Sequence, residues 1–462
     1  MSLYQKLIMN LPEVAGPTQK RLSFKEKLKW TGISLILFFV LGLVPLFGLG
    51  QNALQQFEFL SIILGASFGS IISLGIGPIV TGSIVLQLLN GSGIVKFDLT
   101  SPQGKRMFQG TQKILAIFFI IFEAGIYVFM GGLAPAAELA GTAAYFNIEL
   151  LLVFQLFLGG ILILFMDEIV SKWGFGSGVS LFIAAGVSQS IFIRAFSFLP
   201  SPTNPEIATG AIPALFQSLA AGDPQTAGLM LAAVLSTVVV FVLAVYAQAM
   251  KVEIPLSFGR VRGQGMRWPL SFIYTSNIPV ILVAALMANV QLFARLLQNW
   301  GHPILGQFSG NTPISGLIYW LYSPNLVQKI IQGNIGIVDI GQATVYMVFM
   351  IAGCILFSIF WVQTSGMDSK SQAKNMMSSG LQIPGFRKDQ RILERILDRY
   401  IGPLTIMGAV AVGMLAAAAD LSGALGNGTG ILLAVMIIYK LYEEIAKQHM
   451  MDMHPMMRKF ME

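Results

Sequence analysis

The chain has 462 residues, of which 55% are hydrophobic and only 11% are charged. Soluble globular proteins carry about 25% charged residues, so this composition excludes a water-soluble protein with a polar surface. The formal net charge of +7 can indicate nucleic-acid binding, but in a membrane protein a basic excess is first expected in the cytoplasmic loops.

Ten apolar segments are candidates for membrane-spanning helices, because a crossing takes about 20 predominantly apolar residues. In chain order they lie near 30–48, 71–90, 113–133, 150–166, 178–198, 229–250, 271–293, 342–363, 401–419 and 428–442. An even number of crossings places both termini on the same side of the membrane. The sequence therefore predicts a polytopic, all-α integral membrane protein with ten transmembrane helices.

The distribution of basic residues supports this number of crossings. Of the 29 Lys and Arg residues, 26 fall on the side of the termini, and Arg194, Arg295 and Lys329 fall on the other. Cytoplasmic loops are the ones enriched in Lys and Arg, so both termini are expected in the cytoplasm. An added or omitted helix would destroy this asymmetry.

Residues 59–95 contain no charged residue, although the charge distribution allows only one crossing there. One helix uses about 20 of these residues. The remaining segment, near 54–70, must therefore lie in an apolar environment although it does not span the membrane. Irregular backbone at membrane depth is tolerated only where it is buried in protein or lines a cavity. We therefore expect a short re-entrant helix at about 54–70, with a long external amphipathic linker as the alternative.

Similar short sequences recur at the second and fifth helices of two five-helix halves. They are Gly77-Pro78-Ile79-Val80 and Ile278-Pro279-Val280-Ile281 at the second position, and Gly176-Ser177-Gly178-Val179 and Gly428-Thr429-Gly430-Ile431 at the fifth. Because five is odd, the second half would enter the membrane upside down. Such inverted repeats place the functional site at the interface between the halves, near the midplane.

The domain organisation follows from these segments. We expect a cytoplasmic N-terminal segment at 1–29, an N-terminal half at 30–198, an external hinge loop at 199–228, a C-terminal half at 229–442 with cytoplasmic loops at 251–270 and 364–400, and a cytoplasmic tail at 443–462.

Enzyme chemistry finds little support in the sequence. There is no G-x-x-x-x-G-K-[ST] phosphate loop, and the G-x-S-x-G sequence at 65–69 lacks its strand–turn–helix context and a histidine base. We expect no catalytic residue, metal or cofactor.

The main alternative to a channel is an ion-coupled secondary transporter, which also uses inverted repeats. Against it, the second, fifth, seventh and tenth helices are almost wholly aliphatic where polar coupling groups should lie.

Five separated stretches resemble the SecY family, the central subunits of Sec protein translocons. They are GIGPIVT at 75–81 followed by LQLL at 86–89, residues 176–186, YTSNIP at 274–279, GLQIPGFR at 380–387, and residues 428–444. The stretches occur in the family's order and cover nearly the whole chain. Residues 262–264 and 276–279 are closer to the archaeal and eukaryotic members, so an archaeal plasma membrane is the expected location.

The resemblance implies a protein-conducting channel that translocates unfolded secretory polypeptides and releases transmembrane segments laterally into lipid. It implies an hourglass pore with an aliphatic ring, formed here by Ile76, Val80, Val179, Ile183, Ile281 and Leu433. It also implies a plug, matched by Phe57, Phe59, Leu60, Ile62, Ile63, Leu64 and Ser67. Residues four apart share one helix face, and a hydrophobic constriction can block water and ions by dewetting. Without the resemblance, each ring residue would be interpreted as an ordinary packed or lipid-facing aliphatic, and only its position in the motifs distinguishes it.

Glu123 is the acidic residue that lies deep inside a predicted crossing. Ionisable residues at membrane depth are costly and by default indicate function. The resemblance places Thr81, Glu123 and Asn289 at a lateral gate between the halves, where polar contacts would hold the seam shut. A protonated carboxyl group that only hydrogen-bonds between helices is the alternative, and both can be true together.

The basic loops and the partners complete these expectations. The resemblance implies that the cytoplasmic loops bind the ribosome, through rRNA and ribosomal proteins, with Arg260, Arg262, Arg267 and Arg387 as the contact residues. The positive-inside rule explains the same charges without a ribosome. SecE and a Sec-beta subunit are implied as small membrane partners in a heterotrimer, with signal peptides and nascent polypeptides as substrates and the lipid bilayer as surroundings.

Overall fold

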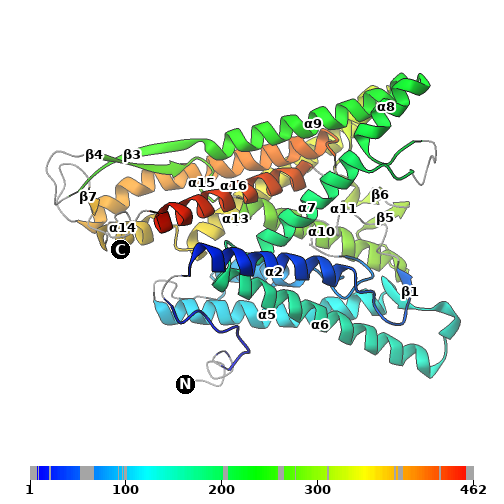
Figure 1. Ribbon diagram of the computed structural model, residues 1–462, viewed down its shortest axis with the longest axis horizontal. Helices are drawn as coiled ribbons and strands as arrows, with labels where there is room; N and C mark the ends of the chain where they lie inside the picture. The colour runs from blue at the N-terminus through cyan, green and yellow to red at the C-terminus, as the bar shows by residue number, and fades with distance from the viewer. Residues whose placement is uncertain are drawn as a thin grey trace.

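The helices of the first half follow the predicted crossings in order (Figure 1). They are α2 (Phe24–Gly42), α4 (Gly77–Gly91), α5 (Pro102–Phe129), α6 (Ala143–Trp173) and α7 (Gly178–Phe196). In this computed structural model the described residues are 8, 10–19, 22–52, 67–91, 93–95, 97, 101–200, 207–258, 265–275, 277–309, 312–378, 381–382, 389–425 and 428–453. The strands β1 (Leu49–Asn52) and β2 (Leu133–Pro135) pair antiparallel, and η1 (Ala137–Leu139) follows them.

The second half also supplies one helix for each predicted crossing. These are α9 (Pro224–Ala249), α10 (Ile278–Asn299), α13 (Ile337–Thr364), α15 (Gln390–Leu421) and α16 (Gly428–Met453). Shorter helices occupy the connections: α8 (Ala211–Ala221), α11 (Leu317–Trp320), α12 (Leu326–Ile331) and α14 (Ser369–Ser378). The predicted all-α architecture is confirmed as the dominant one.

Strands appear in the connections where the sequence suggested only loops. β3 (Lys251–Phe258) pairs with β4 (Gly265–Ser271) and with β7 (Leu381–Gln382), and β5 (Gly306–Ser309) pairs with β6 (Thr312–Gly316). The hydrogen bonds of these short strands pair backbone N–H and C=O groups in the segments that connect the helices. The β3–β4–β7 sheet lies at the same end of the molecule as the chain termini (Figure 1).

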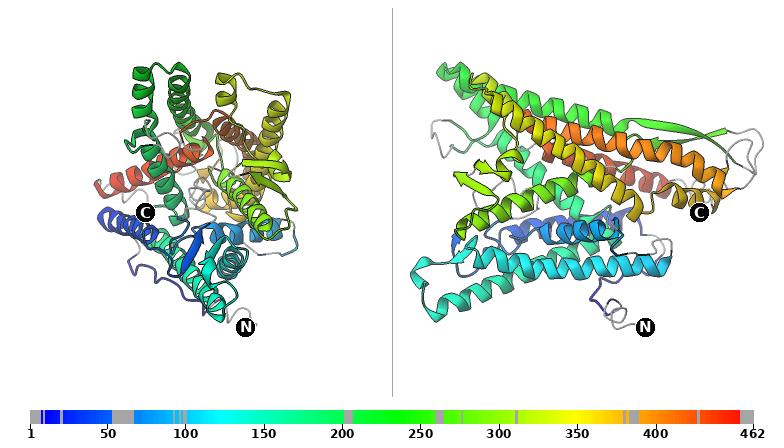
Figure 2. Two further views of the ribbon diagram at one scale, coloured as in Figure 1. Left: turned by 90° about the vertical axis from the view of Figure 1, so that its right-hand side faces the viewer. Right: turned by 180° about the vertical axis from the view of Figure 1, so that it is seen from behind.

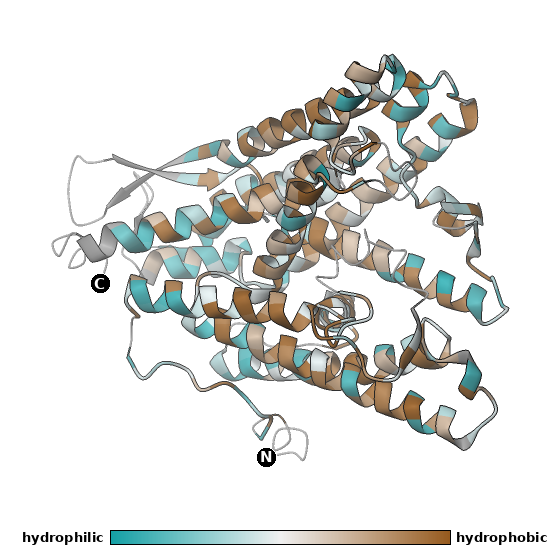
Figure 3. Ribbon diagram, turned by 45° about the vertical axis from the view of Figure 1, so that its right-hand side comes forward, coloured by the Kyte–Doolittle hydropathy of each residue, from teal (hydrophilic) through white to brown (hydrophobic). Residues whose placement is uncertain are grey.

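Seven helices among the described residues are long and apolar enough to cross a membrane by themselves, namely α5, α6, α7, α9, α10, α13 and α15. The other three predicted crossings coincide with α2, α4 and α16. Charged residues open α2 and close α16, and α4 has only 15 residues. Figure 3 shows apolar residues concentrated in the middle of the helices and polar residues toward both ends of the bundle.

The two halves occupy separate sides of the bundle. Seen from one end, α2, α4, α5 and α6 lie together on one side, and α9, α13, α15 and α16 lie on the other (Figure 2). The main hydrophobic core joins them, because it contains buried residues from α4 and α7 as well as from α10, α13 and α16. The interface between the halves is therefore the place to search for a functional site.

Candidate pore and gate

The six predicted ring residues meet in one apolar cluster at the interface between the halves. Ile76, Val80, Ile183, Ile281 and Leu433 are between 1% and 6% exposed, and the partly buried Val179 packs against the same cluster. They come from four elements: α4 with the residue before it, α7, α10 and α16. The structure thus brings together side chains that are up to about 360 positions apart in the sequence.

Helix starts position several of these side chains. Val80, Val179 and Ile281 lie in the first turns of α4, α7 and α10. Pro78 and Pro279 occupy the first turns of α4 and α10, where a missing backbone N–H leaves no hydrogen bond unmade. The branched residues therefore project from well-ordered helix starts rather than from flexible loops.

Two cavities with mixed polar and apolar linings lie along α7, α10 and α16, one toward each end of these helices. The first has a volume of about 770 Å³, and its polar lining includes Gln87, Lys105, Asp167 and Glu444. The second has a volume of about 580 Å³, and its polar lining includes Arg194, Gln291, Asp420 and Thr429. Helices α7, α10 and α16 each contribute residues to both cavities. Along α7 and α16, the predicted ring residues Ile183 and Leu433 lie between the residues that line the two cavities, as an hourglass pore would require.

The three predicted gate residues contact each other across the seam between the halves. Asn289 on α10 donates from Nδ2 to Thr81 Oγ1 at 2.8 Å, and Thr81 Oγ1 lies 3.0 Å from Glu123 Oε1 on α5. Glu123 is 1% exposed and Asn289 is 5% exposed. A buried polar contact of this kind links one half to the other through few hydrogen bonds.

Tyr127 is a member of this cluster that the sequence analysis missed. It lies one helical turn after Glu123, it is fully buried, and its ring packs edge-on against Phe68 with centroids 6.5 Å apart. Within the described residues, Tyr127 Oη, Glu123 Oε2 and Asn289 Oδ1 are buried without a hydrogen-bond partner. The four-residue spacing from Glu123 was the signal that could have identified Tyr127.

Most predicted plug and loop residues lie outside the described residues. This applies to Phe57, Phe59, Leu60, Ile62, Ile63 and Leu64, and to Arg260, Arg262 and Arg387. Ser67 is described, and its hydroxyl donates to the carbonyl oxygen of Gly42 at 3.1 Å, at the end of α2. Arg267 lies in β4, opposite Pro255 of β3.

The described residues contain no group of three or more His, Cys, Asp or Glu that could hold a metal ion.

Comparisons with known proteins agree with this architecture along the whole chain. Residues 70–442 match the family model described as SecY, and residues 36–69 match the model described as the plug domain of Sec61p. The protein translocase subunit SecY of Methanothermobacter thermautotrophicus is 47% identical over 99% of this chain and 98% of its own length. That of Methanocaldococcus jannaschii is 42% identical over 98% of each chain.

Solved structures give the same result. One described as the structure of a protein conducting channel matches with a TM-score of 0.82 at 41% identity, covering 98% of this chain and 99% of its own. Sec61 in the canine ribosome–channel complex from the endoplasmic reticulum matches with a TM-score of 0.80 at 40% identity, covering 98% and 99%. By sequence and by fold, this multi-pass membrane protein belongs to the SecY family.

Proposed function

We propose that this chain forms the protein-conducting channel of a Sec translocon, through which unfolded polypeptides cross the membrane. The observation that carries the proposal is the waist, where six aliphatic side chains, from α4 and the residue before it, α7, α10 and α16, belong to one apolar cluster between two cavities. The SecY relatives and the protein-conducting channel structure support it. The role is one of transport and requires no catalytic group.

The waist suits a passage for polypeptides of many sequences. Branched aliphatic side chains offer no hydrogen bond to a passing chain, so no sequence is held by specific polar contacts. When no chain is present, an apolar constriction excludes water and ions by dewetting. The polar cavities on both sides hydrate the chain before and after it crosses.

The seam between the halves gives a route into lipid. α4 packs against α10 and α13 there, and the Asn289–Thr81–Glu123 contacts hold the two sides together. A hydrophobic signal segment that intercalates at the seam replaces these few polar contacts by apolar packing. Segments that are sufficiently apolar then leave sideways into the bilayer.

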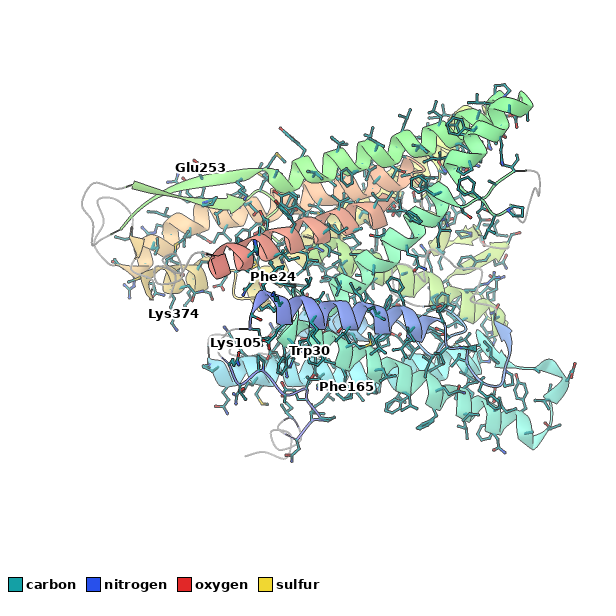
Figure 4. The ribbon with its side chains drawn as sticks, viewed as in Figure 1. Phe24, Trp30, Lys105, Phe165, Glu253 and Lys374 are labelled. Atoms are coloured by element: carbon teal, nitrogen blue, oxygen red, sulfur yellow. The ribbon has the colours of Figure 1, made fainter. Side chains whose placement is uncertain are left out.

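The orientation and the partners belong to the same proposal. Lys105, Glu253 and Lys374, labelled in Figure 4, lie toward the end of the molecule where the chain termini are found. We assign this end to the cytoplasm of an archaeal cell, with the ribosome docking on loops 251–270 and 364–400. The canine relative is described in a ribosome–channel complex, which supports this assignment. SecE and a Sec-beta subunit complete the heterotrimer.

The test is ion conductance through the purified protein in planar bilayers, with and without residues 57–67. We expect a silent membrane for the intact chain and large, weakly selective openings after the deletion, because the deletion removes all seven predicted plug residues. A deleted protein that is folded and inserted but silent would contradict the plugged-channel proposal. An ion-coupled transporter would instead show solute uptake.

A further inference from the structure

Two carboxylates that the sequence analysis did not single out occupy corresponding places in the two halves. Asp167 lies near the end of α6, the fourth helix of the first half, and Asp420 lies at the end of α15, the fourth helix of the second half. Asp167 lines the cavity of about 770 Å³, and Asp420 lines the cavity of about 580 Å³ on the opposite side of the waist. This is the relation expected of an inverted repeat.

Each carboxylate binds the start of the following helix. Asp167 Oδ1 accepts a hydrogen bond from the Val179 N–H at 2.9 Å and lies 3.5 Å from Ser177 Oγ, at the start of α7. Asp420 Oδ1 accepts from the Thr429 N–H at 2.7 Å, and the Thr429 hydroxyl donates to Oδ2, at the start of α16. A carboxylate here satisfies unpaired N–H groups and complements the positive end of the helix dipole.

Glycines allow these close approaches. A Cβ atom on Gly178 would lie 2.6 Å from Asp167 Cα, and one on Gly428 would lie 1.9 Å from the carbonyl carbon of Ala419. Only a residue without a side chain lets the two helices meet at these distances. Gly178 is the second glycine of Gly176-Ser177-Gly178, and Gly428 is the first of Gly428-Thr429-Gly430. Each half therefore uses a glycine of the repeated sequence, at a different position, to seat the fifth helix against the carboxylate.

Both contacts lie beside the ring. Val179 is itself a ring residue, and its N–H is the donor to Asp167. Leu433 lies four residues after Thr429, on the same face of α16. Asp420 also accepts from Tyr346 Oη at 2.6 Å, which ties α13, a helix at the seam, to the same point.

We propose that Asp167 and Asp420 are a matched pair of positioning residues that hold α7 and α16 so that Val179 and Leu433 close the waist. The proposal rests on the proposed channel function. Ordinary helix caps would stabilise the bundle without controlling the pore, and the chain contains such a cap for comparison. Asp223 accepts from the N–H groups of Gln225 and Thr226 at 3.2 Å each, at the start of α9, which supplies none of the six ring residues.

The test is the resting conductance of the full-length chain in planar bilayers with the plug intact. We expect Asp167→Ala and Asp420→Ala to raise the fraction of time spent open by about fivefold, the population change expected when a helix-capping acceptor is lost. Asp167→Asn should stay close to the unsubstituted channel, because the amide oxygen still accepts from the Val179 N–H. The control Asp223→Ala should remain silent.

Folding is monitored for each variant by its thermal unfolding in detergent. If Asp420→Ala is not recovered folded, Thr429→Val combined with Tyr346→Phe removes both hydroxyl donors to Asp420 Oδ2. This double variant should also raise the open fraction, by a smaller factor, because the Thr429 N–H still donates to Oδ1. Silence of all these variants, or equal leakage in Asp223→Ala, would overturn the proposal. The chain without residues 57–67 distinguishes failure of the positioning role from failure of the channel function. If this deletion variant conducts while the aspartate variants are silent, only the positioning role is wrong. If the deletion variant is silent as well, the proposed channel function is also wrong.

Discussion

At the scale of single residues, the polar cluster at the seam combines two requirements. Its hydrogen bonds must hold the halves together at rest, yet they must be few enough to be replaced by an apolar signal segment. The proposed gate residues Asn289, Thr81 and Glu123 fit these requirements, since one amide and one hydroxyl connect three helices. In membranes such interhelical hydrogen bonds contribute only about 0.6 kcal/mol on average.

Replacing Asn289 by Leu tests this role. The substitution removes the hydrogen bond to Thr81 across the seam, and we expect the ratio of open to closed seam to rise about threefold, as a loss of about 0.6 kcal/mol implies. Translocation should then tolerate signal peptides with fewer apolar residues, measured with a series of graded leucine content.

The matched control for Asn289→Leu is Gln298→Leu. Gln298 is also an amide on α10, but it exchanges hydrogen bonds with Phe308 in the β5–β6 hairpin, at 2.7 and 3.1 Å. An unchanged or higher hydrophobicity threshold in Asn289→Leu would contradict the gate assignment.

At the scale of elements, the segment before α2 runs as a strap along the ends of α5 and α6. The Val14 N–H donates to Glu168 Oε2 at 2.9 Å, Lys172 Nζ donates to the Val14 carbonyl at 2.6 Å, and Trp173 Nε1 donates to the Ala15 carbonyl at 2.8 Å. Lys172 also pairs with Glu13. These contacts fix a polar segment that has little apolar area of its own to bury.

Lys172→Ala should loosen the strap. Because exposed ion pairs are worth about 0.2–1 kcal/mol, we expect amide hydrogen exchange across residues 10–19 to accelerate by about twofold to fivefold. Lys374→Ala, on α14, is the control, and equal acceleration in both variants would contradict a local effect.

The same strap should respond to acid. The hydrogen bond from the Lys172 ammonium lowers the pKa of Glu13 below its usual 4.5. A lowered pKa means that the contribution to stability is present above pH 4.5 and is lost as the pH falls through the folded-state value. Exchange in the strap should therefore accelerate below this pH in the unsubstituted protein and change less in Lys172→Ala.

At the scale of the whole molecule, the seal is a property of the assembled waist and not of any one helix. Leu433 is 1% exposed, whereas Ile438, five residues further along α16, is 50% exposed. The two are chemically similar, and only the fold distinguishes the waist from the outer surface.

Leu433→Asn should make the resting channel leak, because an amide at the waist gives water hydrogen bonds and opposes dewetting. Single-channel recording should show openings in Leu433→Asn that are absent from Ile438→Asn, which places the same amide on the outward face of the same helix. Leakage in both variants, or in neither, would contradict the assignment of Leu433 to the seal at the waist.

The crossings and the family were determined by the sequence alone. Run length and the asymmetry of basic residues placed ten crossings, and a described helix lies at each of these places, seven of them long and apolar enough to span a membrane. Such predictions succeed because bilayer thickness and the positive-inside rule act on segments one at a time. Five ordered motifs indicated the SecY family, which the comparisons establish. Glu123 was found because a carboxyl group inside an apolar run is visible without any neighbour.

What depends on distant contacts was decided only by the tertiary structure. Tyr127 becomes notable because it is buried beside Glu123, and Asp167 and Asp420 because each meets the start of the next helix beside the waist. On the sequence, these aspartates lie at helix ends, where charge is ordinary. The two cavities likewise exist only once the halves pack together. Such features depend on which surfaces face each other, and hydropathy along one chain contains no information about the partner surface.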